Sequence, residues 1–572
     1  MLLREHATEE RLNGRYYTPQ DLANYVVDWA TQDILNGRIL EPSCGDGSFL
    51  ESLNIRNLDN RFSIVAIELD ENESILASER IDDSIFINDI QQLENNMNLL
   101  DEIGCKVINE DFYKVYENLI KEERFNIIVG NPPYIRYQYL TESQREEQSV
   151  ILTNNGMKSN KLINAWVSFV VASVQMLNTN GKIGLVIPAE LMQVAYAEEL
   201  RRFLMNKLQR TTIVTFRELV FPNVEQEVVL LLGEKDEDHL EEHQLKIVQY
   251  DNIQQLINDD NMDNIPFNDV EVNDSKWTRY FLDRQCNELI NEIRQDRRFV
   301  RVGDISSVDI GITTGNNDYF CVNNETVNEF DLQNISRPLI ARSVNINGIN
   351  FTQEDWEENI NRGAKTYLVD FPDIPYEQYS DRQRAYIEQG EREEQNTGYK
   401  CRIRQRWYRV PSIWVPDAFL LRRNHLYPKF ILNTDVEAVS TDTMHRIRFN
   451  EGIDHKRAIL SYYNSIALAF TEIEGRSYGG GVLEILPGEF EKVTIPNLND
   501  NELVPDQIVD NLIQEIDNHV RNNNDIEGIL GLIDQAILIE ILGLEQGVVD
   551  QFRQMWTTLR NRRLNRRRAR TV

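Results

Sequence analysis

An alternation of strand-like and helical segments over roughly the first 235 residues constrains the fold more than any other feature. The strand-like runs are short, rich in Val, Ile and Leu, and separated by stretches long enough for helices. They cover residues 38–40, 62–70, 105–112, 125–134, 181–192, 211–219 and 225–234. Strands separated by helices predict a mostly parallel, doubly wound α/β sheet, because parallel neighbours need a crossover connection between them.

The chain has 572 residues, too many for one ordinary core, so we expect further domains. Residues 241–300 are polar and acidic, which is typical of a connecting region, and residues 301–500 are rich in strands and glycine turns. Residues 501–572 predict amphipathic helices followed by an arginine-rich tail. The sequence therefore predicts an α/β domain over 1–240, the connecting region, a mixed α+β domain and C-terminal helices.

Charge is spread unevenly along the chain. The net charge of −33 argues against broad, non-specific binding to polyanions. Residues 400–430 nevertheless carry eight Lys or Arg against the single acid Asp417, and residues 560–570 carry seven arginines and no acid. A local basic stripe can bind nucleic acid on an acidic protein, and a solvated face is the alternative for each stripe. The candidate nucleic-acid contacts are Lys400, Arg402, Arg404, Arg406, Arg409, Arg422 and Arg423.

Cysteine usage and hydropathy exclude several other classes of protein. The five cysteines are scattered without a CxxC pair, so neither a zinc site nor a disulfide framework is predicted, and a reducing cytoplasm fits. The most apolar run, residues 165–177, is short and carries polar residues, which is typical of a core helix rather than a membrane span. His425, His445 and His455 lack ligand spacing, so no metal is expected.

Polar side chains follow successive predicted strands in a fixed order. After the first strand comes a glycine loop, in which Gly45 and Gly47 allow close backbone approach to a ligand. Acidic residues follow the next strands, and two prolines end the strand that contains the apolar run 125–129, because proline cannot donate to a β ladder. Ligands bind at this edge of an open α/β sheet. The candidates are Glu41, Pro42, Ser43, Glu68, Asp111, Phe112, Asn131, Pro132, Pro133 and Tyr134.

This set of motifs resembles the S-adenosylmethionine-dependent amino-methyltransferases of DNA in the gamma order, of the TaqI-like adenine type. "EPSCGDGSF" resembles the family's cofactor loop, "IELD" its ribose-binding acid, "NEDF" its adenine-binding loop and "NPPY" its catalytic motif. "GRYYTPQDLANYVV" resembles the N-terminal cofactor motif, in which Thr18 and Pro19 lie by the methionine end. "FPNVEQEVVLLL" resembles the motif whose phenylalanine, here Phe221, helps hold the base. A second strand end, "FINDI" at 86–90, competes with Asp111 for the adenine-binding role, and Phe112 favours Asp111.

The resemblance implies a Rossmann-like methyltransferase sheet, followed by a target-recognition domain over 301–500. It implies that Asn131 and the Pro132 carbonyl accept the two hydrogens of an adenine amino group while Tyr134 and Phe221 stack on the flipped base. The expected cofactor is S-adenosylmethionine and the expected partner is double-stranded DNA, with a cognate restriction endonuclease as a possible further partner. We expect a cytoplasmic monomer without a membrane or metal partner.

Other functions stay open at this stage. They are methylation of the cytosine 4-amino group, methylation of RNA or of a protein amide, and a non-catalytic role in DNA recognition. Cys44 could act as a covalent nucleophile, but its place in the cofactor loop favours packing. Trp407 and Trp414 could contact DNA or pack in a core.

Overall fold

The computed structural model describes residues 17–91, 100–221, 227–236, 243–270, 276–478, 481–499, 504–523 and 525–565. The chain forms two compact units, the first over residues 1–284 and the second over residues 285–565. Each unit has its own sheets and its own buried apolar clusters.

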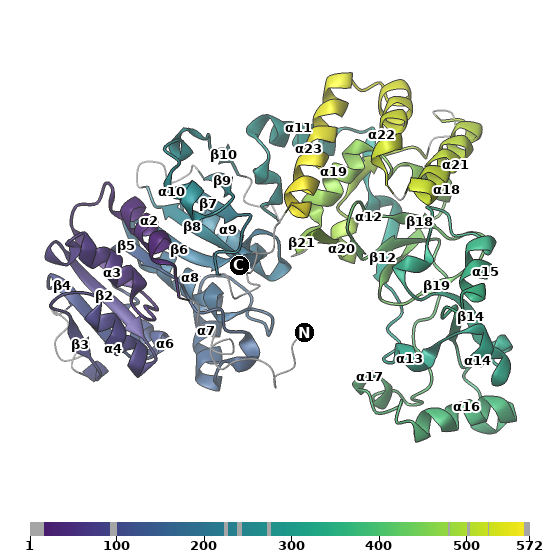
Figure 1. Cartoon of the computed structure of the whole chain (residues 1–572), viewed down its shortest axis with the longest axis horizontal. Coiled ribbons are helices and arrows are strands. Elements are labelled where there is room, and N and C mark those ends of the chain that lie inside the picture. The colour runs from purple at the N-terminus through teal and green to yellow at the C-terminus, as the bar shows by residue number, and fades with distance from the viewer. Residues whose placement is uncertain are drawn as a thin grey trace. The chain divides into compact units, whose positions relative to one another are not determined.

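The first unit is a sandwich of helices around one large sheet (Figure 1). Strand order is β10-β9-β7-β8-β6-β5-β1-β2-β4-β3, and the strands from β3 to β6 in this order are parallel. The strands are β1 (Gly37–Glu41), β2 (Phe62–Glu68), β3 (Ile85–Ile87), β4 (Gly104–Asn109), β5 (Phe125–Gly130), β6 (Leu177–Pro188), β7 (Arg210–Phe216), β8 (Val228–Glu234), β9 (Gln244–Tyr250) and β10 (Asn268–Asp269). The predicted doubly wound α/β fold is confirmed.

Helices cover both faces of this sheet because successive side chains of a central strand point to opposite faces. Along β5, Ile127 and Val129 belong to one apolar cluster, whereas Ile128 between them belongs to the other. The first cluster includes side chains of α2 (Gln20–Thr31), α3 (Ser48–Ile55) and α4 (Glu71–Glu79); the second includes those of α6 (Phe112–Val115), α7 (Glu142–Asn154), α8 (Ala165–Met176) and α9 (Glu198–Lys207). The predicted core helix at 165–177 is α8, which is buried along almost its whole length.

The boundary of the first unit differs from the predicted one. Residues 241–300 were expected to connect domains, but β9 pairs in parallel with β7 along its full length and extends the sheet. The unit ends at Arg284, and α11 (Arg284–Gln295) lies almost wholly in the second unit. Leu245 and Val248 of β9 are buried, and the acidic segments on either side of this short strand concealed it in the sequence.

The second unit combines small sheets, which are antiparallel except for the parallel pair β14–β19, with helices. One sheet has the order β12-β20-β16-β18 and another has the order β13-β15-β14-β19. Their strands are β12 (Ser306–Ile310), β13 (Cys321–Val322), β14 (Ser336–Ile340), β15 (Tyr367–Val369), β16 (Ala418–Leu421), β18 (Phe430–Leu432), β19 (Val439–Ser440) and β20 (Met444–Phe449). Two smaller sheets contain β17 (Arg423–Asn424), β21 (Arg476–Tyr478) and β22 (Val482–Glu484), and β11 (Phe299–Arg301) with β23 (Thr494–Pro496).

The C-terminal helices belong to this second unit rather than to a separate element. They are α21 (Asp506–Asn523), α22 (Glu527–Ile533) and α23 (Gln546–Leu564), and α23 packs along α19 (Ser465–Glu474) (Figure 1). Arg563 in the last turn of α23 is fully buried and pairs with Glu472 of α19, with 2.6 Å between Nη2 and Oε1. Part of the predicted arginine tail is therefore structural, and its residues 566–570 lie outside the described residues.

Candidate functional site

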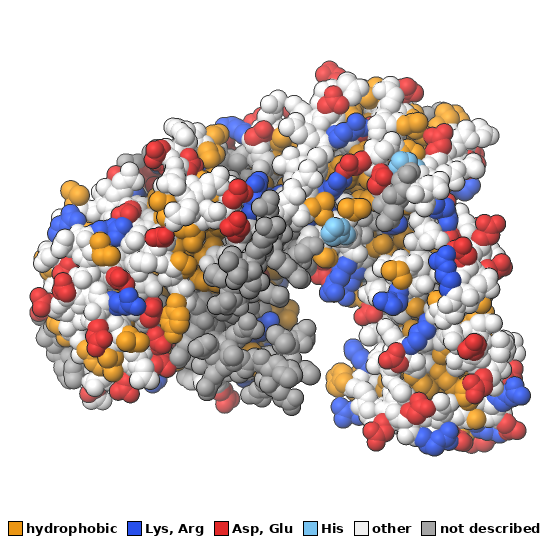
Figure 2. Space-filling view, in the orientation of Figure 1, with side chains coloured by type: hydrophobic (Ala, Val, Ile, Leu, Met, Phe, Trp, Pro, Cys, Tyr) orange, Lys and Arg blue, Asp and Glu red, His pale blue; other side chains and the backbone are white. Residues whose placement is uncertain are grey.

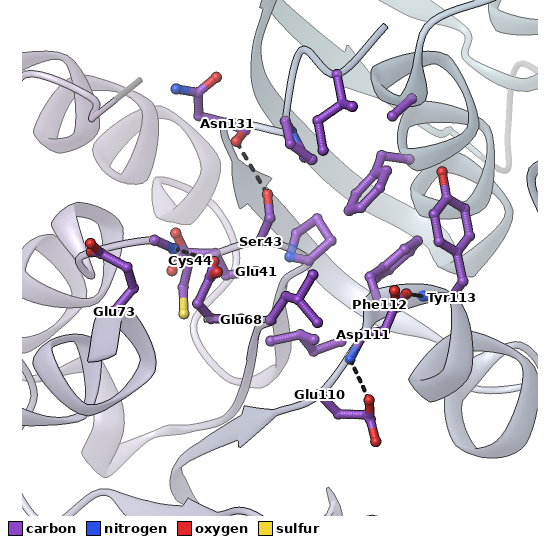
Figure 3. Close-up of a pocket in the computed structure, with 18 of the residues that line it drawn as sticks. Glu41, Ser43, Cys44, Glu68, Glu73, Glu110, Asp111, Phe112, Tyr113 and Asn131 are labelled. Atoms are coloured by element: carbon purple, nitrogen blue, oxygen red, sulfur yellow. Dashed lines mark hydrogen bonds between the residues drawn. The ribbon is translucent and has the colours of Figure 1, made fainter. Parts of the chain in front are cut away.

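A cavity of about 330 Å³ lies in the first unit at the C-terminal ends of four adjacent strands. Its lining follows β1 (Glu41 to Asp46, Ser48 and Phe49), β2 (Glu68 and Leu69), β4 (Glu110 to Tyr113) and β5 (Asn131, Pro133 and Ile135) (Figure 3). Because parallel strands end at the same edge, motifs separated by up to 90 residues of sequence meet in one place. The cavity brings together most of the predicted site residues.

The loop between β1 and α3 forms one wall of the cavity. Gly45 has a φ of +52° with no atom within 4 Å of where a Cβ would stand, so the backbone is open to the cavity. Gly47 has a φ of +86°, and a Cβ there would lie 2.8 Å from the Ala77 Cα of α4. The Cys44 amide donates to the Ile67 carbonyl at 2.9 Å, which fixes the loop to β2. These glycines therefore keep the loop close to its neighbours and leave its inner side free.

Acidic side chains line this cavity. Glu41 is fully buried, and among the described residues neither carboxylate oxygen has a hydrogen-bond partner. Burial, together with the charges of Asp46 and Glu68, raises the pKa of Glu41 well above its usual value. Glu68 accepts hydrogen bonds from the Gly45 amide at 3.0 Å and the Asp70 amide at 2.9 Å, so its carboxylate is held at the wall of the cavity. This lining suits a ligand that carries hydroxyl, amino or cationic groups.

Asp111 and Phe112 occupy the end of β4 beside this acidic wall. Asp111 Oδ1 accepts from the Tyr113 amide at 2.8 Å and so caps α6. The Phe112 ring stacks on Phe169 of α8, with 4.3 Å between centroids, and offers a fixed apolar surface to the cavity. Asp89, the competing candidate, accepts from the Gln91 amide and is absent from the described lining of this cavity. The position of Asp111 favours it for the adenine-binding role.

The diproline corner after β5 borders the same cavity. The Asn131 carbonyl accepts from the Ser43 hydroxyl at 3.2 Å, while Figure 3 shows its side-chain amide directed away from Ser43 and the acidic residues. Pro132 is buried, and Pro133 lines the cavity. The Tyr134 hydroxyl donates to the Val186 carbonyl of β6 at 3.0 Å, which fixes the ring beside the corner. Contacts to the loop after β1 and to β6 thus fix the Asn131 carbonyl and the Tyr134 ring.

The remaining predicted residues lie around this site. Thr18 lines the cavity, and Pro19 directly precedes α2. Phe221 is buried in the apolar cluster that contains Val129, outside the described lining of the cavity, and residues 222–226 lie outside the described residues. Burial raises the pKa of the Cys44 thiol well above its usual value, and a buried neutral thiol is a poor nucleophile.

Comparison with known proteins agrees with this arrangement. Residues 53–221 match the family described as Eco57I restriction-modification methylase, and residues 274–538 match the C-terminal domain of Type II methyltransferase M.Eco57I. The chain is 24% identical to Type II methyltransferase M.AccI of Acinetobacter calcoaceticus over 550 residues, covering 92% of this chain and 93% of that protein. It is 26% identical to Type II methyltransferase M.HindII of Haemophilus influenzae, covering 56% of this chain and 57% of that protein.

The chain belongs to the Eco57I-type restriction-modification methyltransferases. Its motifs follow the gamma order, with the cofactor loop before the catalytic corner, as the resemblance implied. The methyl donor is S-adenosylmethionine, and the predicted cofactor is confirmed.

The cavity of this methyltransferase fits that cofactor. The buried carboxylate of Glu41 lacks a described partner, and the ammonium and sulfonium groups of the cofactor carry positive charge. The carboxylates of Glu68 and Asp111 line the cavity and suit ribose hydroxyls and an adenine amino group, and Phe112 offers a flat apolar face.

Some residues of the methyltransferase site were missed in the sequence. Tyr17 and Glu73 line the cavity, and the Tyr17 hydroxyl donates to the Glu73 carboxylate at 2.8 Å. Gln144 also lines it and contacts Asp111. The pattern Thr-x-x-Gln at 141–144 signalled a helix start, but nothing in the pattern located that helix at the cavity.

The candidate DNA contacts of the second unit have several different environments. Arg404 donates to the carbonyls of Thr313 and Thr314 and lies over the Phe320 ring. Arg406 and Arg409 pair with Asp373 at 3.1 and 2.9 Å. Arg422 and Arg423 share Glu484 at 3.0 and 3.1 Å.

Lys400 and Arg402, by contrast, are exposed on α17 (Tyr399–Arg402) and make no ion pair among the described residues. On the face shown in Figure 2, Lys and Arg side chains of the second unit lie among Asp and Glu side chains. Trp407 packs against Tyr319 and Tyr408, whereas the guanidinium carbons of Arg446 and Arg448 lie over the Trp414 ring, 4.4 and 4.3 Å from its centroid.

Within the described part of the chain, no group of His, Cys, Asp and Glu side chains could hold a metal ion. No helix in the same ranges is long and apolar enough to cross a bilayer.

Proposed function

We propose that this methyltransferase modifies the 6-amino group of an adenine at a specific site in double-stranded DNA. The observation that carries the proposal is the position of the corner Asn131-Pro132-Pro133-Tyr134, which borders the cofactor cavity at the end of β5. The corner presents an amide, fixed carbonyls and an aromatic ring where an amine and a methyl donor must meet. Restriction-modification relatives support DNA as the substrate.

The reaction needs help because the lone pair of an adenine amino group is delocalised into the ring. When the Asn131 side-chain oxygen and the Pro132 carbonyl accept the two amino hydrogens, the nitrogen can become pyramidal and regain its lone pair. Proline rigidity and the Ser43 contact to the Asn131 carbonyl keep the acceptors preorganised. The bound cofactor supplies an electrophilic methyl group beside the corner. A strong general base is unnecessary, since the amine becomes acidic once methylated.

The target base must leave the duplex to reach this corner. Tyr134, held by its hydrogen bond to the Val186 carbonyl, provides a fixed ring for stacking, and Phe221 is assigned a supporting role. In the second unit, Lys400 and Arg402 are assigned to DNA phosphates because their charges are exposed. Arg404, Arg406 and Arg409 are assigned mainly to bracing the loops they contact. Arg422 and Arg423 are assigned to phosphates only in part, since they share Glu484.

Substituting Asn131 tests the assignment directly. Asn131→Ala should reduce methyl transfer at least a hundredfold, by analogy with the loss of one preorganised polar group from an active site, while cofactor affinity stays within a few-fold. Transfer is measured with labelled cofactor and cofactor affinity by calorimetry. Full activity of this variant would disprove the role of the corner.

Expression in a host free of DNA methylation, followed by single-molecule sequencing, identifies the base. Methyladenine within a recurring motif supports the proposal and gives the recognition site. Cytosine methylated at its 4-amino group would keep the corner chemistry and change the substrate. If no modified base were found in the DNA, RNA or protein would be favoured as the substrate. A cognate restriction endonuclease is assigned as a partner only if it cleaves the same motif when unmethylated.

A further inference from the structure

Gln144 in the first turn of α7 joins two parts of the cofactor cavity through its side-chain amide. Its Nε2 donates to Asp111 Oδ2 at 2.7 Å, and its Oε1 accepts from the Thr141 amide at 3.1 Å. The Thr141 hydroxyl in return accepts from the Gln144 amide at 3.2 Å, which completes a capping box. Both ends of the amide are therefore used, and the partners fix its orientation, since the carboxylate accepts and the amide N–H donates.

Asp111 keeps room for a ligand in this arrangement. One oxygen accepts from the Tyr113 amide and the other from Gln144, whereas a carboxylate offers about four acceptor positions. Asp111 and Gln144 both line the cavity, and the Phe112 ring lies beside them. The two contacts engage one oxygen each, so the carboxylate is held in a fixed orientation and its remaining lone pairs have a fixed direction.

The chain between the catalytic corner and α7 forms another wall of the same cavity. Ile135, Tyr139, Leu140 and Thr141 all line it. Arg145 donates to the carbonyls of Tyr137 and Gln138 at 3.1 and 3.0 Å and lies over the Tyr137 ring. This wall is thus tied to the start of α7, and Gln144 connects it to Asp111 on β4.

We propose that Gln144 is a positioning residue for the adenine of the cofactor. It directs the free lone pairs of Asp111 toward the amino group of that adenine, and it holds the wall at residues 135–141 against the ligand. The proposal rests on the assigned role of Asp111. It predicts that Gln144 determines how strongly the site prefers a 6-amino purine over a 6-oxo purine.

The test compares S-adenosylhomocysteine with S-inosylhomocysteine by calorimetry in the absence of nucleic acid. Gln144→Glu is the main variant, because an ionised glutamate at this position retains the capping box but has no hydrogen to donate to Asp111. Loss of a hydrogen bond to a charged acceptor should weaken S-adenosylhomocysteine about tenfold, with little change for S-inosylhomocysteine. The preference of the wild-type site for the amino form should therefore shrink about tenfold. Gln144→Ala should behave likewise, and Glu146→Ala, exposed on the same helix, should match the wild type.

Two outcomes overturn the proposal. In the first, Gln144→Glu keeps the wild-type preference between the two ligands within twofold. In the second, both ligands weaken equally, which indicates a purely structural role for Gln144. Thermal unfolding of each variant confirms that the protein tested is folded. Since no nucleic acid is present, failure of this proposal and failure of the adenine-methylation proposal are distinguishable.

Discussion

The buried acidic side chains of the two units differ in whether they have partners. In the first unit, Glu41 is buried at the cofactor cavity without a hydrogen-bond partner among the described residues. In the second unit, buried acids have cationic partners: Glu472 pairs with Arg563, Asp534 with Arg553 and Asp355 with Arg521. A buried charge without a partner costs free energy unless a ligand satisfies it, whereas a paired one fixes two elements relative to each other. We therefore expect the unpartnered acid to serve ligand binding and the paired acids to serve stability, and substitutions can test this difference.

The largest effect is expected at the buried pair of the second unit. Arg563→Ala leaves Glu472 buried without its partner and also removes donors to the carbonyls of His425 and Gly481. We expect a loss of about 3–5 kcal/mol in the free energy of unfolding, because breaking a buried pair exposes the remaining charge to an apolar environment. Denaturant unfolding, monitored by a spectroscopic probe located in the second unit, measures this loss of stability.

A double substitution provides the control for that experiment. Glu472→Leu with Arg563→Met removes both charges and should recover much of the lost stability. If Arg563→Ala alone left the unfolding free energy unchanged, the pair would have no architectural role.

A smaller effect of opposite sign is expected at the unpartnered acid. Glu41→Gln should stabilise the cofactor-free protein by about 1–3 kcal/mol at pH 7, because it removes a charge that burial disfavours. The same change should weaken binding of S-adenosylmethionine. Thermal unfolding without cofactor and calorimetry with it measure the two effects. If Glu41→Gln were less stable than the wild type without cofactor, the unpartnered charge would not be the source of a stability cost.

The pH dependence of that gain has a definite sign. The pKa of Glu41 is raised in the folded protein, so folding favours its protonated form. The unfolding free energy of the wild type is therefore highest below the pKa that Glu41 has in the unfolded chain. It falls as pH rises through the pKa that Glu41 has in the folded protein. The advantage of Glu41→Gln should disappear below about pH 4 and grow as pH rises above the unfolded pKa. An advantage that persisted unchanged in acid would assign the effect to packing instead.

The smallest effect is expected at the exposed cations of the second unit. Lys400→Gln and Arg402→Gln should each weaken DNA binding by about 1 kcal/mol and reduce the slope of log affinity against log salt by about one, as for the loss of a phosphate contact. Arg406→Gln, whose charge already pairs with Asp373, should change the slope less. Salt titrations of DNA binding measure all three. Equal slopes for the three variants would remove the distinction between exposed and paired cations.

The sequence predicted what depends on strand ends, and missed what depends on contacts between distant side chains. Asp111 and Asn131 meet at the cavity because parallel strands end at one edge, and this follows from pattern alone. Gln144 contacts a residue 33 positions earlier, which no local pattern encodes. The ion pairs of the basic stripe were missed for a related reason, because Asp373, which pairs with Arg406, lies 33 positions before it in the sequence.

The burial of Arg563 also has a consequence for the order in which the protein is made. During synthesis the first unit can close its sheet soon after β10 leaves the ribosome, since its described core lies within the first 284 residues. The second unit cannot neutralise Glu472 until residue 563 emerges. A nascent chain that stalls before the last turn of α23 therefore has a folded first unit and an incompletely folded second unit. Chaperones and proteases act on such incompletely folded chains in preference to the complete protein.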